Sequence, residues 1–152
     1  PGTITGVRYF KGPRNTGTHV GSIWSADGQR LASVAFDPVG ETASGTWREA
    51  ALPAPVRITP GTEYVVSYFA PNGFYSADNE YFTLRPRVST PVVAYGDDAF
   101  SVNGVYRYGP NGGFPNQTFR GSNYWTDVVF SPDSPPSVWV GAATIFGSCL
   151  SP

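Results

Sequence analysis

The chain has 152 residues, a length typical of one domain, and is rich in glycine (18), proline (15) and aromatic residues (15%) but poor in charged ones (14%). This composition excludes a mainly helical protein, which would be richer in Ala, Leu, Glu and Lys. The formal net charge is −1 and Lys11 is the single lysine, so no basic stripe exists and we expect no nucleic-acid partner.

The sequence contains no membrane or disulfide signal. No run of 18 or more apolar residues is present, so we expect no membrane span. The N-terminus lacks a charged segment followed by an apolar one, and we therefore expect any export signal to have been removed or to lie outside this sequence. Cys149 is the only cysteine, which excludes a disulfide within the chain.

Short strands separated by turn residues are predicted along most of the chain. The first strand is expected over 2–11, and Gly12-Pro13 begins the turn that follows it. Asp27-Gly28 predicts the tight turn of a hairpin within 19–36, because both residue types tolerate positive φ. The further strands are expected at 46–52, 56–59, 63–69, 81–84, 91–95, 105–108 and 123–130.

About eight to ten short strands with closely spaced turns are typical of an antiparallel β-sandwich, either jelly-roll or immunoglobulin-like. No helical periodicity lasts for three turns, so helix should be minimal. We assign 1–131 to the sandwich and 132–152, where prolines gather, to a linker or C-terminal extension. The expected core comprises Ala32, Val34, Phe36, Tyr64, Val66, Tyr68, Val128 and Phe130, and Trp24, Trp47 and Trp125 are also interpreted as core residues.

Aromatic residues in loops rich in Gly and Asn give the strongest functional signal. Two such segments, 70–80 and 105–114, follow strands and could meet at one end of a sandwich, as binding loops do in this architecture. Aromatic faces stack on sugar rings while polar neighbours bond the hydroxyls, so these loops suit glycans. The alternative is that the rings hold long loops onto the sandwich. The predicted ligand-binding residues are Asn72, Tyr75, Tyr81, Tyr108 and Phe114.

Catalytic and metal sites have weaker support. His19 is the only histidine, and no nucleophile-elbow motif accompanies the serines, so no catalytic residue is assigned. Paired carboxylates would suit a glycosidase, but the sequence does not pair them, and solvated charges are the simpler interpretation. Acidic loops at 78–80 and 97–98 allow a structural calcium ion, although neither has EF-hand spacing. The candidate carboxylates are Glu41, Glu49, Asp78, Glu80, Asp97, Asp98 and Asp127.

Six segments between residues 2 and 130, taken in chain order, together resemble one known family. They are GTITGVRYFKG at 2–12, NTGTHVGSIWSADGQRLASVAF at 15–36, ETASGTW at 41–47, PGTEYVVSYFAPNGFYS at 60–76, NGVYRYG at 103–109 and FPNQTFRGSNYWTDVVF at 114–130. The chain resembles a bacterial extracellular family catalogued as domain of unknown function 4082. The resemblance implies a β-sandwich module of a secreted or surface protein, often beside other domains. Relatives often carry histidines where this chain has Phe69 and Phe74, so a histidine-dependent role is not carried over.

These observations favour a non-catalytic, extracellular or cell-surface accessory module that binds glycan or another surface component. A structural spacer or adhesion module without a small ligand is the alternative, and a hydrolase that uses loop carboxylates is a third hypothesis. The partners expected are a glycan or cell-surface component and the neighbouring domains of a larger protein.

Overall fold

A computed structural model describes residues 1–38, 44–83, 85–89, 91–96 and 102–133. Within these residues the chain is all-β and contains no helix, as predicted, and therefore no helix long and apolar enough to cross a membrane. The strands are β1 (Gly2–Lys11), β2 (Val20–Ser25), β3 (Arg30–Ala35), β4 (Thr46–Ile58), β5 (Tyr64–Phe69), β6 (Arg87–Ser89), β7 (Val92–Ala94), β8 (Val105–Tyr106), β9 (Gln117–Thr118) and β10 (Thr126–Pro132).

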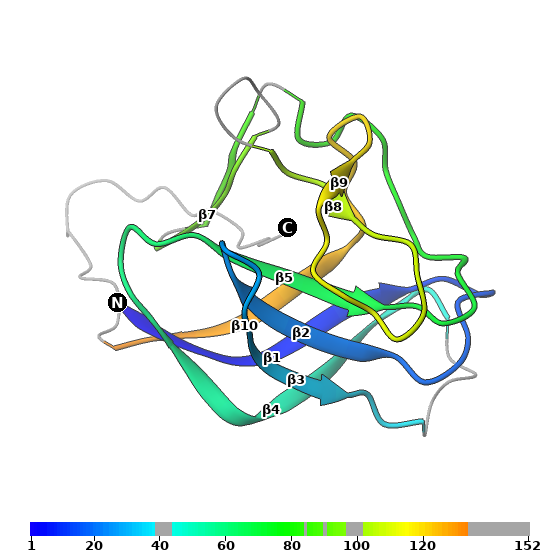
Figure 1. The fold of residues 1–152 in the computed structure, drawn as a ribbon, viewed down its shortest axis with the longest axis horizontal. Helices are drawn as coiled ribbons and strands as arrows, with labels where there is room; N and C mark the ends of the chain where they lie inside the picture. The colour runs from blue at the N-terminus through cyan, green and yellow to red at the C-terminus, as the bar shows by residue number, and fades with distance from the viewer. Residues whose placement is uncertain (39–43, 84, 90, 97–101, 134–152) are drawn as a thin grey trace.

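Two three-stranded antiparallel sheets form the β-sandwich (Figure 1). One has the strand order β10-β1-β4 and the other β3-β2-β5, so β1 and β2 are the central strands. The sheets approach closely at Gly21 of β2, where an added Cβ would lie 2.8 Å from Cγ1 of Val7 in β1. Gly21 is thus the point at which the absence of a side chain lets the two layers meet.

The core lies between these sheets. Val7, Tyr9 and Ile23 are fully buried at its centre, and Tyr9 stacks on Tyr68 with ring centroids 4.5 Å apart. The buried cluster is completed by Ile4, Phe36 and Leu52. The predicted core residues that bury or pack against it are Ala32, Val34, Phe36, Val66, Tyr68, Val128 and Phe130.

The predicted core residues Tyr64, Trp47 and Trp125 lie outside the buried cluster. Trp125 contacts Trp47 and Tyr81 instead. Tyr64 stands at the start of β5, and its hydroxyl accepts a hydrogen bond from the Thr59 amide at 3.0 Å across the preceding turn. Trp47 is 37% exposed, because it lies on the outer face of its sheet, opposite Phe10. The core prediction is therefore wrong for Trp47 and Trp125. Tyr64 shares its strand face with Val66 and Tyr68, but it lies at the end of β5 and outside the buried cluster.

Two predicted strands, 46–52 and 56–59, are a single strand. β4 pairs with β1 along its length, but the register shifts at Thr5 of β1. Ile4 pairs with Val56 of β4, whereas Gly6 pairs with Ala51. Four residues of β4, including Pro53 and Pro55, therefore lie opposite Thr5 in a bulge. Proline lacks the amide proton that a ladder requires, which explains why the sequence suggested a break.

The strand predicted at 81–84 is wrong for Tyr81 and Phe82, which lie in a turn, and residue 84 lies outside the described residues. Glu80 has a φ of 63°, which breaks extended backbone, and the Phe82 amide donates to the carbonyl of Gly121. Phe82 is nevertheless buried, so its hydrophobicity serves packing rather than strand pairing.

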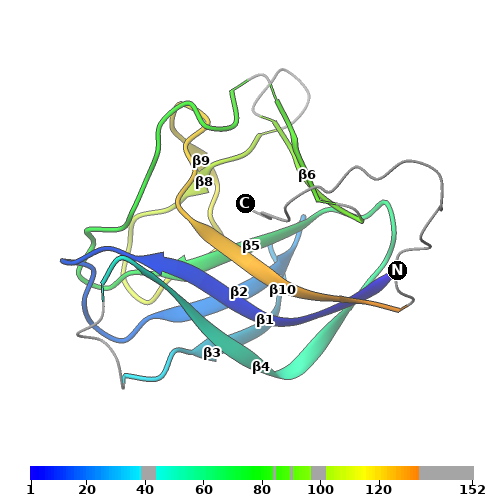
Figure 2. The ribbon, with the colours of Figure 1, turned by 180° about the vertical axis from the view of Figure 1, so that it is seen from behind.

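The long connections carry two small ladders, β6-β7 and β8-β9, on one side of the sandwich (Figures 1 and 2). β10 ends at Pro132 and Arg57 of β4 pairs with Asp133 at 2.5 Å. The division of the chain at 131 stays a prediction, since residues 134–152, and Cys149 with them, lie outside the described residues.

Candidate functional site

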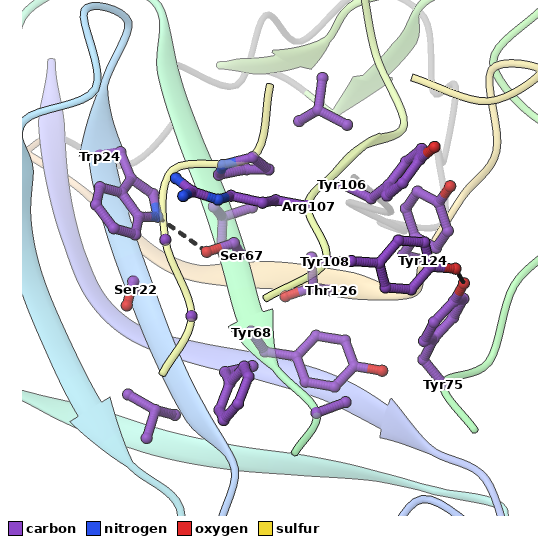
Figure 3. A pocket seen from close by; sticks show the side chains of 18 of the residues that line it. Ser22, Trp24, Ser67, Tyr68, Tyr75, Tyr106, Arg107, Tyr108, Tyr124 and Thr126 are labelled. Carbon is purple, nitrogen blue, oxygen red and sulfur yellow. Dashed lines mark hydrogen bonds between the residues drawn. The ribbon is translucent and has the colours of Figure 1, made fainter. Parts of the chain in front are cut away.

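A groove of about 520 Å³ lies between the outer face of the sheet β3-β2-β5 and the segment 103–115 (Figure 3). Side chains alternate between the faces of a strand, so Ser22 and Trp24 point outward while Ile23 enters the core. Ser67 of β5 lies opposite Ser22 and adds a second hydroxyl to this floor. Tyr68 also lines the groove, because β5 is the edge strand of its sheet.

Trp24 closes one end of the groove as a packed residue. It is only 7% exposed, and its indole Nε1 donates to Oγ of Ser67 at 2.9 Å. Phe114 contacts its ring edge-on at 5.8 Å, and the guanidinium of Arg30 lies 5.7 Å from its ring centroid. This end is therefore held together by side chains that are already satisfied.

Four tyrosines form the other end, which we call the tyrosine cluster: Tyr75, Tyr106, Tyr108 and Tyr124. The hydroxyls of Tyr75 and Tyr108 share a hydrogen bond of 2.7 Å. The rings of Tyr106 and Tyr108 lie 5.3 Å apart, those of Tyr75 and Tyr124 5.5 Å, and those of Tyr106 and Tyr124 6.0 Å. Tyr108 is 70% exposed, so this network supports a ring that faces solvent.

The surroundings of Tyr75 and Tyr124 favour their neutral phenols. Burial raises the pKa of Tyr75, and the hydrogen bond with Tyr108 raises it further. Burial likewise raises the pKa of Tyr124. The cluster therefore presents hydroxyl groups, which both donate and accept hydrogen bonds.

The structure brings Tyr75 and Tyr108 of the five predicted binding residues together in the groove. Phe114 lies at the Trp24 end, where it packs over the Asp27-Gly28 turn. Asn72 is exposed and donates to Oγ1 of Thr16 at 3.2 Å, beside the groove residues Pro71 and Gly73. The five thus do not form a single patch, and their role in binding stays a prediction.

Tyr81 belongs to a separate aromatic group on the outer face of the other sheet, with Phe10, Trp47 and Trp125. The Trp125 ring lies 5.5 Å from that of Tyr81 and 6.2 Å from that of Trp47. Trp125 has a φ of 51°, which is rare for a bulky residue, and its Nε1 donates to Asp78 at 2.9 Å.

His19 is a buried structural residue. Its ring stacks on Tyr9 at 4.7 Å, and its Nε2 lies 2.7 Å from Oδ1 of Asn15. It lies in the sandwich interior and does not line the groove.

None of the described carboxylates lines the groove. Asp127 is buried and pairs with Arg8 at 2.6 Å; burial raises the pKa of this carboxyl, and Arg8 partly offsets the rise. Asp78 bonds Trp125, and Glu80 lies 4.0 Å from Arg120. No group of three or more potential metal ligands occurs among the described residues. Glu41, Asp97 and Asp98 lie outside them.

Sequence reasoning did not single out Arg107 and Ser67 for the site. Arg107 lines the groove from the same segment as Tyr108, and the alternation Tyr-Arg-Tyr at 106–108 was the signal that could have indicated it. Ser67 gave no signal, since a serine in a strand has many roles.

Comparison with known proteins gives one match. The family described as Domain of unknown function (DUF4082) matches residues 1–126, and because this is most of the chain, the chain belongs to that family. No curated protein and no solved structure matches it. The family description states no activity, so the function must be argued from the groove.

Proposed function

We propose that this member of the DUF4082 family is a non-catalytic module that binds glycan in the groove. The observation that carries the proposal is the exposed ring of Tyr108, which is 70% exposed and is held in place by Tyr75. A ring that its neighbours already hold in place loses little entropy when a ligand stacks on it.

The neighbours of Tyr108 suit a sugar. The C–H face of a pyranose ring is apolar and stacks on an aromatic ring, while its hydroxyls need hydrogen-bond partners. Ser67 accepts a bond from Trp24 and keeps a proton to donate, and Ser22 adds a second hydroxyl to the floor. A groove with an aromatic end and a hydroxyl-lined floor thus meets both requirements.

The groove offers no carboxylate or histidine for acid–base work among the residues that the structure describes. Glycoside hydrolysis ordinarily needs two carboxyl groups on either side of the scissile bond. The lining therefore favours binding over hydrolysis. Structural polysaccharides lie outside cells, so the proposal includes an extracellular or cell-surface location. The module would lie beside other domains of a larger protein.

Affinity gel electrophoresis of the domain in gels that contain xylan, β-glucan, dextran or polygalacturonate tests the proposal. We expect at least one polysaccharide to retard the domain, and Tyr108→Ala to weaken that binding about tenfold or more, as for truncated aromatic anchors at interfaces. Tyr108→Phe should retain most of the binding, because it keeps the stacking ring.

Phe119→Ala is the matched control, since Phe119 is 52% exposed but lies outside the groove. It should leave retardation unchanged, and all three variants should melt close to the unchanged domain. If Tyr108→Ala instead lowers the melting temperature without affecting retardation, the ring is a structural contact and the spacer or adhesion alternative is favoured.

A further inference from the structure

The charged side chains that line the groove all carry one sign. Arg30 and Arg107 are cationic, and no Asp or Glu appears in the described lining. This local charge contrasts with the chain as a whole, whose formal net charge is −1. A concave site lined by one sign of charge raises the local concentration of ligands of the opposite sign.

Arg107 has free hydrogen-bonding capacity. The structure shows no hydrogen bond or ion pair for its side chain among the described residues, whereas Arg8 and Arg57 pair with Asp127 and Asp133. Its guanidinium lies against Gly113, where an added Cβ would be 2.9 Å from Nη1. The glycine thus leaves room for the guanidinium beneath the loop, with its donors available to a ligand.

Arg107 and Tyr108 are adjacent in the chain and extend in opposite directions, Arg107 toward Trp24 and Tyr108 toward Tyr75 (Figure 3). The Arg30 guanidinium lies over the Trp24 ring, and both Arg30 and Arg107 line the groove. The groove therefore has a basic end beside Trp24 and, at its other end, the tyrosine cluster.

We infer that the groove selects an acidic saccharide, in which an oxyanion substituent binds Arg107 while a sugar ring stacks on Tyr108. This inference rests on the proposed function and adds the chemical class of its ligand. A guanidinium matches carboxylate and sulfate oxygens with two parallel N–H donors, and such charge-assisted bonds are stronger than neutral ones.

The test compares binding to paired polymers immobilised for biolayer interferometry. Polygalacturonate, alginate and hyaluronan are each paired with their methyl esters, which keep the sugar but remove the charge, and dextran sulfate is paired with dextran. We expect at least one acidic polymer to bind about tenfold or more tightly than its uncharged partner, with a preference that weakens as salt is added. Binding to polygalacturonate, alginate or hyaluronan identifies carboxylate as the anion. Binding to dextran sulfate alone identifies sulfate.

Arg107→Gln should abolish the preference and leave the melting temperature unchanged. Arg85→Gln removes the same charge from an exposed residue outside the groove and should keep the preference. Equal binding to charged and uncharged partners, or a preference that survives Arg107→Gln, would overturn the inference while leaving glycan binding intact. No binding to any polymer, charged or uncharged, would overturn the proposed function as well.

Discussion

Replacing Gly21 with alanine should strain the contact between the two sheets. The new methyl group would lie 2.8 Å from Cγ1 and 2.9 Å from Cβ of Val7, and 3.2 Å from Cε2 of Phe36. Overpacking of this kind costs about 1–3 kcal/mol. Loss of glycine's freedom in the unfolded chain offsets about 0.4–1 kcal/mol, which leaves a net loss of about 1–2 kcal/mol. For a domain of this size the melting temperature should fall by roughly 2–8 °C.

A double-mutant cycle with Val7→Ala shows whether this loss comes from the sheet contact. Val7→Ala alone removes two buried methyl groups and should cost about 2–3 kcal/mol. The double variant should be about 1 kcal/mol more stable than the sum of the single losses, because Val7→Ala removes the atom that clashes most closely. Urea denaturation followed by tryptophan fluorescence gives each value. Strict additivity, or a neutral Gly21→Ala, would refute this packing of the sheets.

Two further predictions concern titratable groups. Burial raises the pKa of Tyr68, Tyr75 and Tyr124 above the ordinary tyrosine value of 10.0. Near that pH the unfolded chain therefore loses phenol protons that the folded state keeps. The free energy of unfolding should therefore fall as pH rises above about 10. Absorbance at 295 nm should show tyrosines that ionise only when the protein unfolds. If all nine tyrosines ionise normally in the folded protein, the prediction is wrong. Arg8→Met should destabilise the fold by about 2–3 kcal/mol at neutral pH, because it leaves the buried Asp127 carboxylate without its cation. The cost is moderate because the Arg8 side chain is itself one-third exposed to solvent. That cost should shrink at acidic pH, where Asp127 is protonated, and a cost independent of pH in urea denaturation would exclude the ion pair as its cause.

The strands follow from local patterns in the sequence wherever one face is buried. In β3 the alternation of Ala32 and Val34 identified the inner face, and Asp27-Gly28 located the turn before it. β4 was split in two because Pro53 and Pro55 resemble a strand end, whereas the bulge that accommodates them depends on pairing with β1. Such pairing is a long-range property that local composition does not contain.

The site was predictable only in part, for a similar reason. Tyr75 and Tyr108 were indicated by their Gly- and Asn-rich loops, and both line the groove. Tyr81 has the same local setting, but the left-handed backbone at Glu80 and the ring of Trp125 hold it in the other aromatic group. Arg107 became notable only when the folded structure showed which charged residues share its groove.

The most direct test of glycan binding in this groove is an NMR titration of the ¹⁵N-labelled domain with oligosaccharides of the polysaccharide that retards it most. We predict that chemical-shift changes will concentrate at Ser67, Arg107 and Tyr108, and that Tyr108→Ala will suppress them. Shifts that instead concentrate around Trp47 and Trp125, or that persist unchanged in Tyr108→Ala, would contradict the assignment of the binding site to this groove.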